Sequence, residues 1–213
     1  MAYGGFRQIL GPFIRNKIGV VEGEQFLPAK PPFILALNHV GFMDGLVLVT
    51  YIYLKYNGRR TFYLTNERMW KLWGQKLARN WLGMIPVFDD KRGDSLREAI
   101  DVLKRGEIVG IFPEGTRNQD RHNLLIAKTG AARMALATKV PLIPVGLRNN
   151  TGHRIGKAFR SLWHKDQKVD INFGPAVDLS EFSNREIDKP LLQEATKKLM
   201  QAIGRLCGKN YPF

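Results

Sequence analysis

Short apolar segments of strand type alternate with helical segments along most of the chain, and this alternation limits the fold more than any other feature. Phe33–Leu37 is a continuous apolar run of the kind that forms a buried strand, and Leu191–Leu206 carries apolar residues at helical spacing. Strands that alternate with helices of this length predict an α/β fold. We expect a mixed, largely parallel sheet flanked by helices on both faces, in a single domain with a short N-terminal helical segment.

The other elements are predicted from the same patterns. Asp44–Lys55 is expected to be a helix, although its Val, Ile and Thr content leaves a strand open. The further predicted strands are Val20–Gly23, Thr61–Leu64, Met84–Phe88, Ile108–Phe112, Leu142–Leu147 and Val169–Phe173, and the further helices are Glu67–Leu82, Ser95–Arg105 and Lys128–Lys139.

The chain shows no repeat or linker, so we expect two parts only. Residues 1–19 form an amphipathic segment with possible membrane contact, in which Gly11-Pro12 interrupts the helical spacing, and residues 20–213 form the α/β domain. The apolar run Gly45–Leu54 is only ten residues long, too short to cross a bilayer. We find no signal peptide, and the lone Cys207 cannot form an intramolecular disulfide, so the expected location is the cytoplasm or its membrane surface.

The charge of the chain predicts an anionic partner. The 213 residues carry a formal net charge of +14, and the excess is uneven, since Arg148–Lys168 holds six basic residues and the single acid Asp166. A field of this sign concentrates nucleic acid, anionic lipid or phosphorylated substrate. Charge alone does not choose among them.

A first polar loop, Asn38–Asp44, directly follows the predicted strand Phe33–Leu37. A histidine works as a base near neutral pH when a carboxylate fixes its tautomer, and Asp44 can fold back onto His39 across this loop. The alternative is that Asp44 only caps the following helix. A lone His-x4-Asp pair is common by chance, so this pair by itself favours the alternative.

A second polar loop, Phe112–Arg117, follows the predicted strand Ile108–Phe112. Gly115 allows close backbone approach to a ligand, and Arg117 offers a planar fork suited to phosphate. An ordinary turn with a solvated Arg117 is the alternative. Because both loops follow strands of one sheet, they fall where α/β proteins bind ligands.

Taken together and in order, these motifs resemble the glycerolipid acyltransferase family. The motifs are Asn-His-x4-Asp, then Phe-Pro-Glu-Gly-Thr-Arg, then Val140–Val145, with Lys128–Ala135 similar to the segment that leads into the last motif. The resemblance covers about residues 20–147. The family includes 1-acylglycerol-3-phosphate acyltransferase and its lysophospholipid relatives.

The resemblance implies direct acyl transfer from acyl-CoA or acyl-carrier protein to a lysophospholipid hydroxyl. His39 would be the general base and Asp44 would orient it, with no metal and no cofactor. The second motif would bind the glycerol phosphate of the acceptor through Glu114, Gly115, Thr116 and Arg117. We find no zinc-like cluster and no Gly-x-Ser-x-Gly motif, which agrees with a direct mechanism. The expected acceptor is lysophosphatidate, and glycerol 3-phosphate or another lysophospholipid is the alternative.

Three positions depart from the family pattern. Gly41 stands where the family usually has Ser, and Asn66 and Asp89 stand where it commonly has basic residues. Lys91 or Arg92 could supply the missing phosphate contact, and a solvated charged turn is equally open. These changes leave the acceptor open.

The lipid substrates imply a peripheral enzyme on the cytoplasmic face of an anionic membrane. Three basic segments with aromatic residues could dock there: 6–18, the Trp stripe 70–81, and 148–168. For the Trp stripe, core packing is the alternative. A nucleic-acid-binding protein and a thioesterase are rival functions, but neither explains both loops. The sequence does not fix chain-length preference or oligomeric state.

Overall fold

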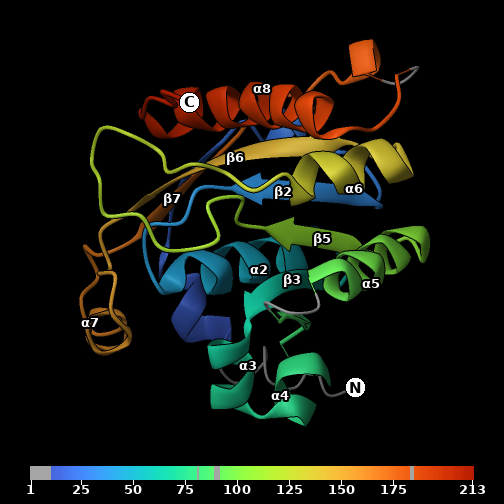
Figure 1. The fold of residues 1–213 in the computed structure, drawn as a ribbon. Coiled ribbons are helices and arrows are strands. Elements are labelled where there is room, and N and C mark those ends of the chain that lie inside the picture. Colours follow the sequence, from blue (N-terminus) through green and yellow to red (C-terminus); the bar gives the residue numbers. More distant parts are fainter. Residues whose placement is uncertain (1–10, 81, 89–91, 183–184) are drawn as a thin grey trace.

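Five consecutive buried residues, Phe33–Leu37, form the central strand β2 of a seven-stranded sheet (Figure 1). The structure is a computed structural model that describes residues 11–80, 82–88, 92–182 and 185–213, with only the backbone described at 68, 72, 73 and 92. The strands are β1 (Ile18–Glu22), β2 (Phe33–Leu37), β3 (Thr61–Asn66), β4 (Met84–Val87), β5 (Ile108–Ile111), β6 (Leu142–Asn149) and β7 (Val169–Phe173). The α-helices are α2 (Met43–Lys55), α3 (Glu67–Trp73), α4 (Gln75–Asn80), α5 (Arg92–Lys104), α6 (Gly130–Thr138), α7 (Ile155–Ser161) and α8 (Lys189–Cys207), and the 3-10 helices are η1 (Glu24–Phe26) and η2 (Ser180–Phe182).

The sheet is mostly parallel and has the strand order β1-β7-β6-β2-β5-β3-β4. Strands β6, β2, β5, β3 and β4 run in one direction, β7 runs antiparallel to β6, and β1 runs parallel to β7. The carboxyl ends of β6, β2 and β5 are therefore neighbours at one edge. This is the edge at which the predicted loops 38–44 and 112–117 emerge.

Helices cover both faces of the sheet because the buried strands are apolar on both sides. Phe33, Leu35 and Leu37 pack into a core with α2 and α7, while Ile34 and Ala36 pack into a core with α5, α6 and α8. Figure 1 shows α8 and α6 on one side of the sheet and α2 on the other. The predicted mixed, largely parallel α/β fold is confirmed.

The helix predicted over Glu67–Leu82 is wrong as one continuous element. Gly74 has a φ of 73° and ends α3, and α4 begins at Gln75. Glycine reaches this left-handed region without the steric cost that other residues meet, so the helical pattern is broken there. Trp70 is buried, as core packing requires, whereas Trp81 and the side chain of Trp73 lie outside what the structure describes.

Two further differences concern segments that carry charge. Helix α7 was not predicted, because it is only seven residues long and sits in a mainly polar stretch. Near the N-terminus, residues 11–15 are helical, so Gly11-Pro12 lies in helical backbone, and Phe6–Leu10 of the predicted segment lie outside the described residues. Strand β1 begins at Ile18, so the predicted boundary between residues 19 and 20 falls inside a strand.

Among the described residues, no helix is both long and apolar enough to cross a membrane.

Candidate active site

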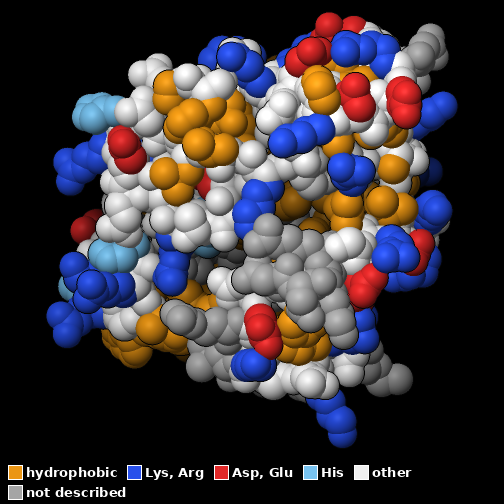
Figure 2. Space-filling model, viewed as in Figure 1, with side chains coloured by type: hydrophobic (Ala, Val, Ile, Leu, Met, Phe, Trp, Pro, Cys, Tyr) orange, Lys and Arg blue, Asp and Glu red, His pale blue; other side chains and the backbone are white. Residues whose placement is uncertain are grey.

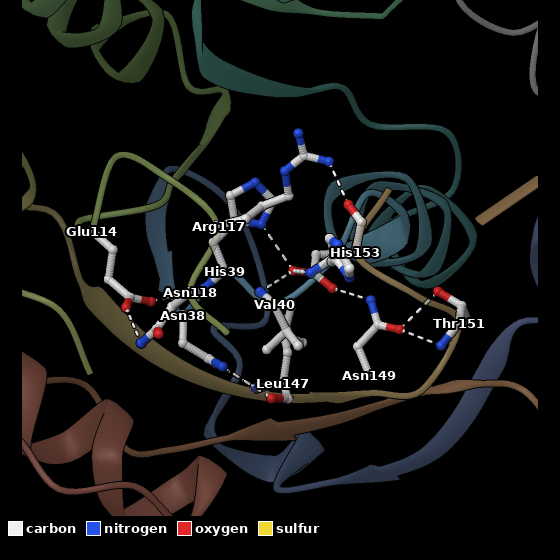
Figure 3. Close-up of polar contacts among 12 residues, drawn as sticks. Asn38, His39, Val40, Glu114, Arg117, Asn118, Leu147, Asn149, Thr151 and His153 are labelled. Atoms are coloured by element: carbon white, nitrogen blue, oxygen red, sulfur yellow. Dashed lines mark hydrogen bonds and ion pairs between the residues drawn. The ribbon is translucent and has the colours of Figure 1, made fainter. Parts of the chain in front are cut away.

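His39 and Asp44 form a hydrogen-bonded pair at the carboxyl end of β2. His39 Nδ1 lies 2.9 Å from Asp44 Oδ2, and the Asp44 side chain is completely buried while the imidazole keeps a fifth of its surface exposed (Figure 3). With Nδ1 held by the carboxylate, the opposite ring nitrogen, Nε2, is the one available to exchange a proton. Because Asp44 contacts the His39 imidazole, it does more than cap α2, which was the alternative.

The Asp44 carboxylate accepts hydrogen bonds on both oxygens. Besides the imidazole, Oδ2 accepts the backbone N–H groups of Val40 at 2.6 Å and Gly41 at 2.8 Å. Oδ1 accepts the side-chain amide of Asn149 at 2.5 Å. These donors fix the direction of the carboxylate, which is what an orienting partner of a histidine base needs.

Asn149 was not predicted as a site residue. It is the last residue of β6, which pairs with β2, and its Oδ1 in turn accepts the N–H and the hydroxyl of Thr151. In the sequence, Asn149 stands out only as a polar residue near the end of a predicted strand. The contact with Asp44 depends on the register between two strands more than a hundred residues apart.

Gly41 and Asn149 fit one another. A Cβ at Gly41 would lie 2.5 Å from Asn149 Nδ2 and 2.8 Å from the carbonyl oxygen of Gly152. The serine that the family usually carries here would therefore displace the amide that holds Asp44. In this chain, Gly41 and the amide of Asn149 occupy the space together.

Glu114 holds the His39 loop from the neighbouring strand. Its carboxylate is buried, with Oε1 accepting the backbone N–H of His39 at 3.0 Å. Oε2 accepts the Asn118 amide at 2.8 Å and the Leu125 N–H at 2.9 Å, and the N–H of Asn118 reaches back to the carbonyl of His39 at 2.6 Å. The predicted contact of Glu114 with substrate stays a prediction, and in the structure this carboxylate is engaged inside the protein.

Asn38 fixes the start of the same loop. It is buried, and its side-chain amide extends the pairing of β2 with β6 by donating to the carbonyl of Leu147 at 3.0 Å and accepting its N–H at 2.7 Å. The loop 38–44 is thus held by β6 on one side through Asn38 and Asn149, and by the loop after β5 on the other through Glu114 (Figure 3).

Gly115, Thr116 and Arg117 lie exposed beside this pair, at the mouth of a cavity. Arg117 Nη1 donates to the backbone carbonyl of His153 at 2.5 Å, and the guanidinium forms no ion pair with a described acidic residue. Two further cations, Lys128 and Arg133, line the same cavity, and a Cβ at Gly115 would lie 3.1 Å from Lys128 Nζ. Neither cation was predicted as a site residue, although both stand in the segment Lys128–Ala135 that resembles the family.

The cavity has a volume of about 1150 Å³, and His39 lies on its wall. It extends from the cationic mouth along α2 and over the ends of β3 and β4. Its apolar lining includes Phe42, Leu46, Val49, Leu82, Met84 and Leu96. A base, a cluster of cations and a long apolar wall therefore share one space.

The structure describes only part of the predicted phosphate-binding residues outside the second loop. Lys91 lies outside the described residues, and Arg92 begins α5 with its side chain undescribed, so both stay predictions. Asn66, which stands at a position that is commonly basic, lines the cavity and caps α3 by accepting the N–H of Met69 at 2.9 Å. Asp89 is outside the described residues. Within the described part of the chain, no group of three His, Cys, Asp or Glu residues could hold a metal ion.

Comparisons with known proteins identify the family of the chain. Residues 19–148 match the family model described as Acyltransferase. The chain is 30% identical over 193 residues to a 1-acyl-sn-glycerol-3-phosphate acyltransferase of Bacillus subtilis, covering 89% of this chain and 88% of the relative. It is 28% identical over 219 residues to a lyso-ornithine lipid O-acyltransferase of Rhizobium meliloti, covering 89% of this chain and 71% of that one.

The fold is also found in a solved structure. The crystal structure of the 1-acyl-sn-glycerophosphate (LPA) acyltransferase PlsC from Thermotoga maritima superposes with a TM-score of 0.62 at 24% identity, covering 96% of this chain and 88% of that one. This likeness concerns the fold, while the family model and the Bacillus relative carry the assignment. The chain belongs to the glycerolipid acyltransferase family, a family of O-acyltransferases.

Proposed function

We propose that this enzyme transfers a fatty acyl group from an acyl thioester to the free hydroxyl of 1-acylglycerol 3-phosphate, forming phosphatidate at a membrane surface. The observation that carries the proposal is the shared cavity, in which His39 lies between a cationic mouth and a long apolar wall. The relatives named as 1-acyl-sn-glycerol-3-phosphate acyltransferases support the choice of acceptor. The donor is acyl-CoA or acyl-carrier protein, and no metal or cofactor is needed.

In the proposed mechanism, His39 Nε2 takes the proton of the acceptor hydroxyl while that oxygen attacks the thioester carbonyl carbon. The tetrahedral intermediate collapses, the C–S bond breaks, and the protonated imidazole returns the proton to the leaving thiolate. Asp44 keeps the imidazole in the required tautomer and stabilises its charge throughout. A thioester is activated, so the enzyme does not need a nucleophile of its own.

Arg117, with Lys128 and Arg133 in the same cavity, supplies positive charge for the acceptor phosphate. A guanidinium fork binds phosphate through paired N–H groups, and holding the phosphate places the neighbouring hydroxyl near His39. Positioning of this kind contributes a large part of the rate of an acyl transfer. Gly115 and Thr116 complete the proposed phosphate loop, and Lys91 or Arg92 remain candidates for a further contact.

The proposal is tested by mass spectrometry of the products made by purified wild type and His39→Ala. The acceptors are lysophosphatidate, glycerol 3-phosphate and two zwitterionic lysolipids, each offered with acyl-CoA and with acyl-carrier protein. We expect phosphatidate from wild type and a loss of roughly 10²–10⁴-fold in His39→Ala. Equal product from the variant would remove His39 from its role, and free fatty acid without esterified product would identify a thioesterase.

The acceptor panel also decides the alternative, acylation of glycerol 3-phosphate or another lysophospholipid by the same mechanism. A relative named as a lyso-ornithine lipid O-acyltransferase shows why acceptors without a phosphomonoester belong in the panel. Preference for an acceptor without a phosphomonoester would keep His39 and Asp44 in their roles and withdraw Arg117 as a ligand of a phosphomonoester. The comparison of donors answers the remaining question of CoA against carrier protein.

A further inference from the structure

Helix α7 exposes an apolar stripe that the proposed chemistry does not use. Ile155 is 42% exposed, Phe159 46% and Trp163 79%, and the three follow one another at a spacing of four residues. Residues at this spacing share one side of a helix or its continuing turn. The opposite side is buried, since Ala158 and Ser161 are fully enclosed. A tryptophan this exposed is unusual for a side chain that is highly buried on average.

Basic side chains surround the stripe. They are Arg154, Lys157, Arg160, Lys165 and Lys168, all exposed, and none forms an ion pair with a described acidic residue. Figure 2 shows Lys and Arg side chains gathered beside hydrophobic ones at the lower left, where α7 lies in Figure 1. Asp166 is the one acidic residue of the segment, so the net charge around the stripe is positive. An apolar stripe within net positive charge matches the interface of an anionic lipid surface, where tryptophan rings sit at headgroup level.

The segment is held firmly against the domain. Lys17 is buried at the start of β1, and its Nζ donates to the carbonyls of Ser161 at 2.5 Å, His164 at 2.5 Å and Gln167 at 3.1 Å. These carbonyls belong to the end of α7 and the turns after it, where those of Ser161 and His164 also accept the N–H groups of His164 and Gln167. The apolar stripe is thus presented by a fixed segment.

The stripe also reaches the mouth of the active-site cavity. The ring of Phe159 lies 6.0 Å from the ring of Phe42, which lines the cavity beside His39. Arg117 is bonded to the carbonyl of His153, in the loop that leads into α7. A surface that touches α7 therefore lies next to the opening through which a lipid acceptor enters.

From these observations we infer that α7 and its following turn, residues 154–168, form the surface that docks the enzyme on an anionic bilayer. Of the three basic segments considered from the sequence, this one presents three exposed large apolar side chains together with five exposed basic residues. The described part of segment 6–18 exposes one such side chain, Phe13, and also lines the cavity at Gly11 and Ile14. The inference rests on the proposed function for the identity of the lipid acceptor. The docking itself is measured without catalysis.

The test is flotation of the full chain with vesicles of phosphatidylcholine containing phosphatidylglycerol, and with vesicles of phosphatidylcholine alone. The variants are K157Q/R160Q and Trp163→Ala, and the matched control is K104Q/K197Q, which removes the same charge from exposed positions on α5 and α8. Removal of two basic residues near an anionic surface is expected to weaken partition roughly 30-fold. Loss of the indole is expected to weaken it roughly tenfold.

Acylation of a water-soluble, short-chain acceptor is measured in parallel. We expect it unchanged in all three variants, so a failure of docking and a failure of the proposed reaction are separated. Support requires weaker flotation of both α7 variants, restricted to the anionic vesicles, with the control near wild type. Unchanged flotation of the α7 variants, or an equal loss in the control, would overturn the inference. So would a dimer in solution that Trp163→Ala dissociates, because the stripe would then belong to a second copy of the chain.

Discussion

The two ends of the active-site cavity are built differently. At the end that holds His39, the Asp44 carboxylate is buried and accepts hydrogen bonds from four groups, and the loop is held by two neighbouring strands. At the mouth, Arg117 is exposed and its one described protein contact is the carbonyl of His153. Under the proposed function, this difference predicts that the chemical step depends on fixed geometry, whereas recognition of the acceptor depends on charge from exposed side chains.

The largest effect expected from this comparison of the two ends of the cavity is at Asp44. Asp44→Asn keeps the shape of the side chain but offers an N–H where His39 Nδ1–H needs an acceptor, which stabilises the wrong tautomer. We expect kcat to fall about 10⁴-fold with little change in the KM of the acceptor. Steady-state kinetics measures both, and the thermal unfolding temperature checks that the variant is folded. A tenfold effect or less would mean that the buried pair is not required for the chemical step.

Arg117 probes the other end of the cavity. Arg117→Ala removes a charge-assisted contact to phosphate, and we expect the KM of a phosphorylated acceptor to rise about 10- to 100-fold while kcat changes less. The same variant should leave a zwitterionic acceptor nearly unaffected. Lys128→Ala provides a matched comparison, since it removes a second cation from the same cavity. A large fall in kcat with unchanged KM would place Arg117 with the fixed end and break the distinction.

Asn149 is a positioning residue in our view, because it acts on the reaction through Asp44. Asn149→Ala deletes one hydrogen bond to a buried carboxylate, and we expect kcat to fall about tenfold with KM unchanged. The pH profile of kcat should shift in the variant, because the partner of the imidazole loses a donor. A purely structural role would lower the unfolding temperature without moving that profile.

The smallest expected effect concerns Gly41. Gly41→Ser introduces the side chain that the family usually carries, and here it meets the Asn149 amide and the carbonyl of Gly152. We expect kcat to fall a few-fold in wild type and by less when Asn149 is already alanine. A double-mutant cycle over the two positions measures this coupling. Additive effects would show that Gly41 and Asn149 are independent.

The sequence predicted the features that depend on local pattern. The order of strands and helices follows from apolar runs and periodicity, and the pairing of His39 with Asp44 follows from their short separation across one turn. The break at Gly74 was missed because glycine is compatible with a helix as well as with its end, and the left-handed φ is not encoded by periodicity.

The contacts that the sequence could not predict all join distant segments. Asn149 reaches Asp44 because β6 pairs with β2 in one particular register, and Glu114 reaches the N–H of His39 because β5 is the other neighbour of β2. The motif resemblance pointed to Glu114 as a ligand of the substrate, but its burial and its three N–H partners depend on tertiary packing. Helix α7 is only seven residues long and exposes its large apolar residues Ile155 and Phe159, so its apolar pattern does not mark a buried side.

The reversed direction of β7 has a consequence for how such an enzyme can diverge. Because β7 runs antiparallel to β6, residues 150–168 leave and re-enter the sheet at the same edge and cross neither of its faces. A parallel β7 would have required a crossover packed on the sheet. The sheet therefore does not constrain the exposed side chains of this excursion, while its buried residues Ala158 and Ser161 keep it attached to the domain. Under the proposed docking, the exposed side chains of α7 can change with the membrane while the hydrogen bonds that hold His39 and Asp44 stay the same.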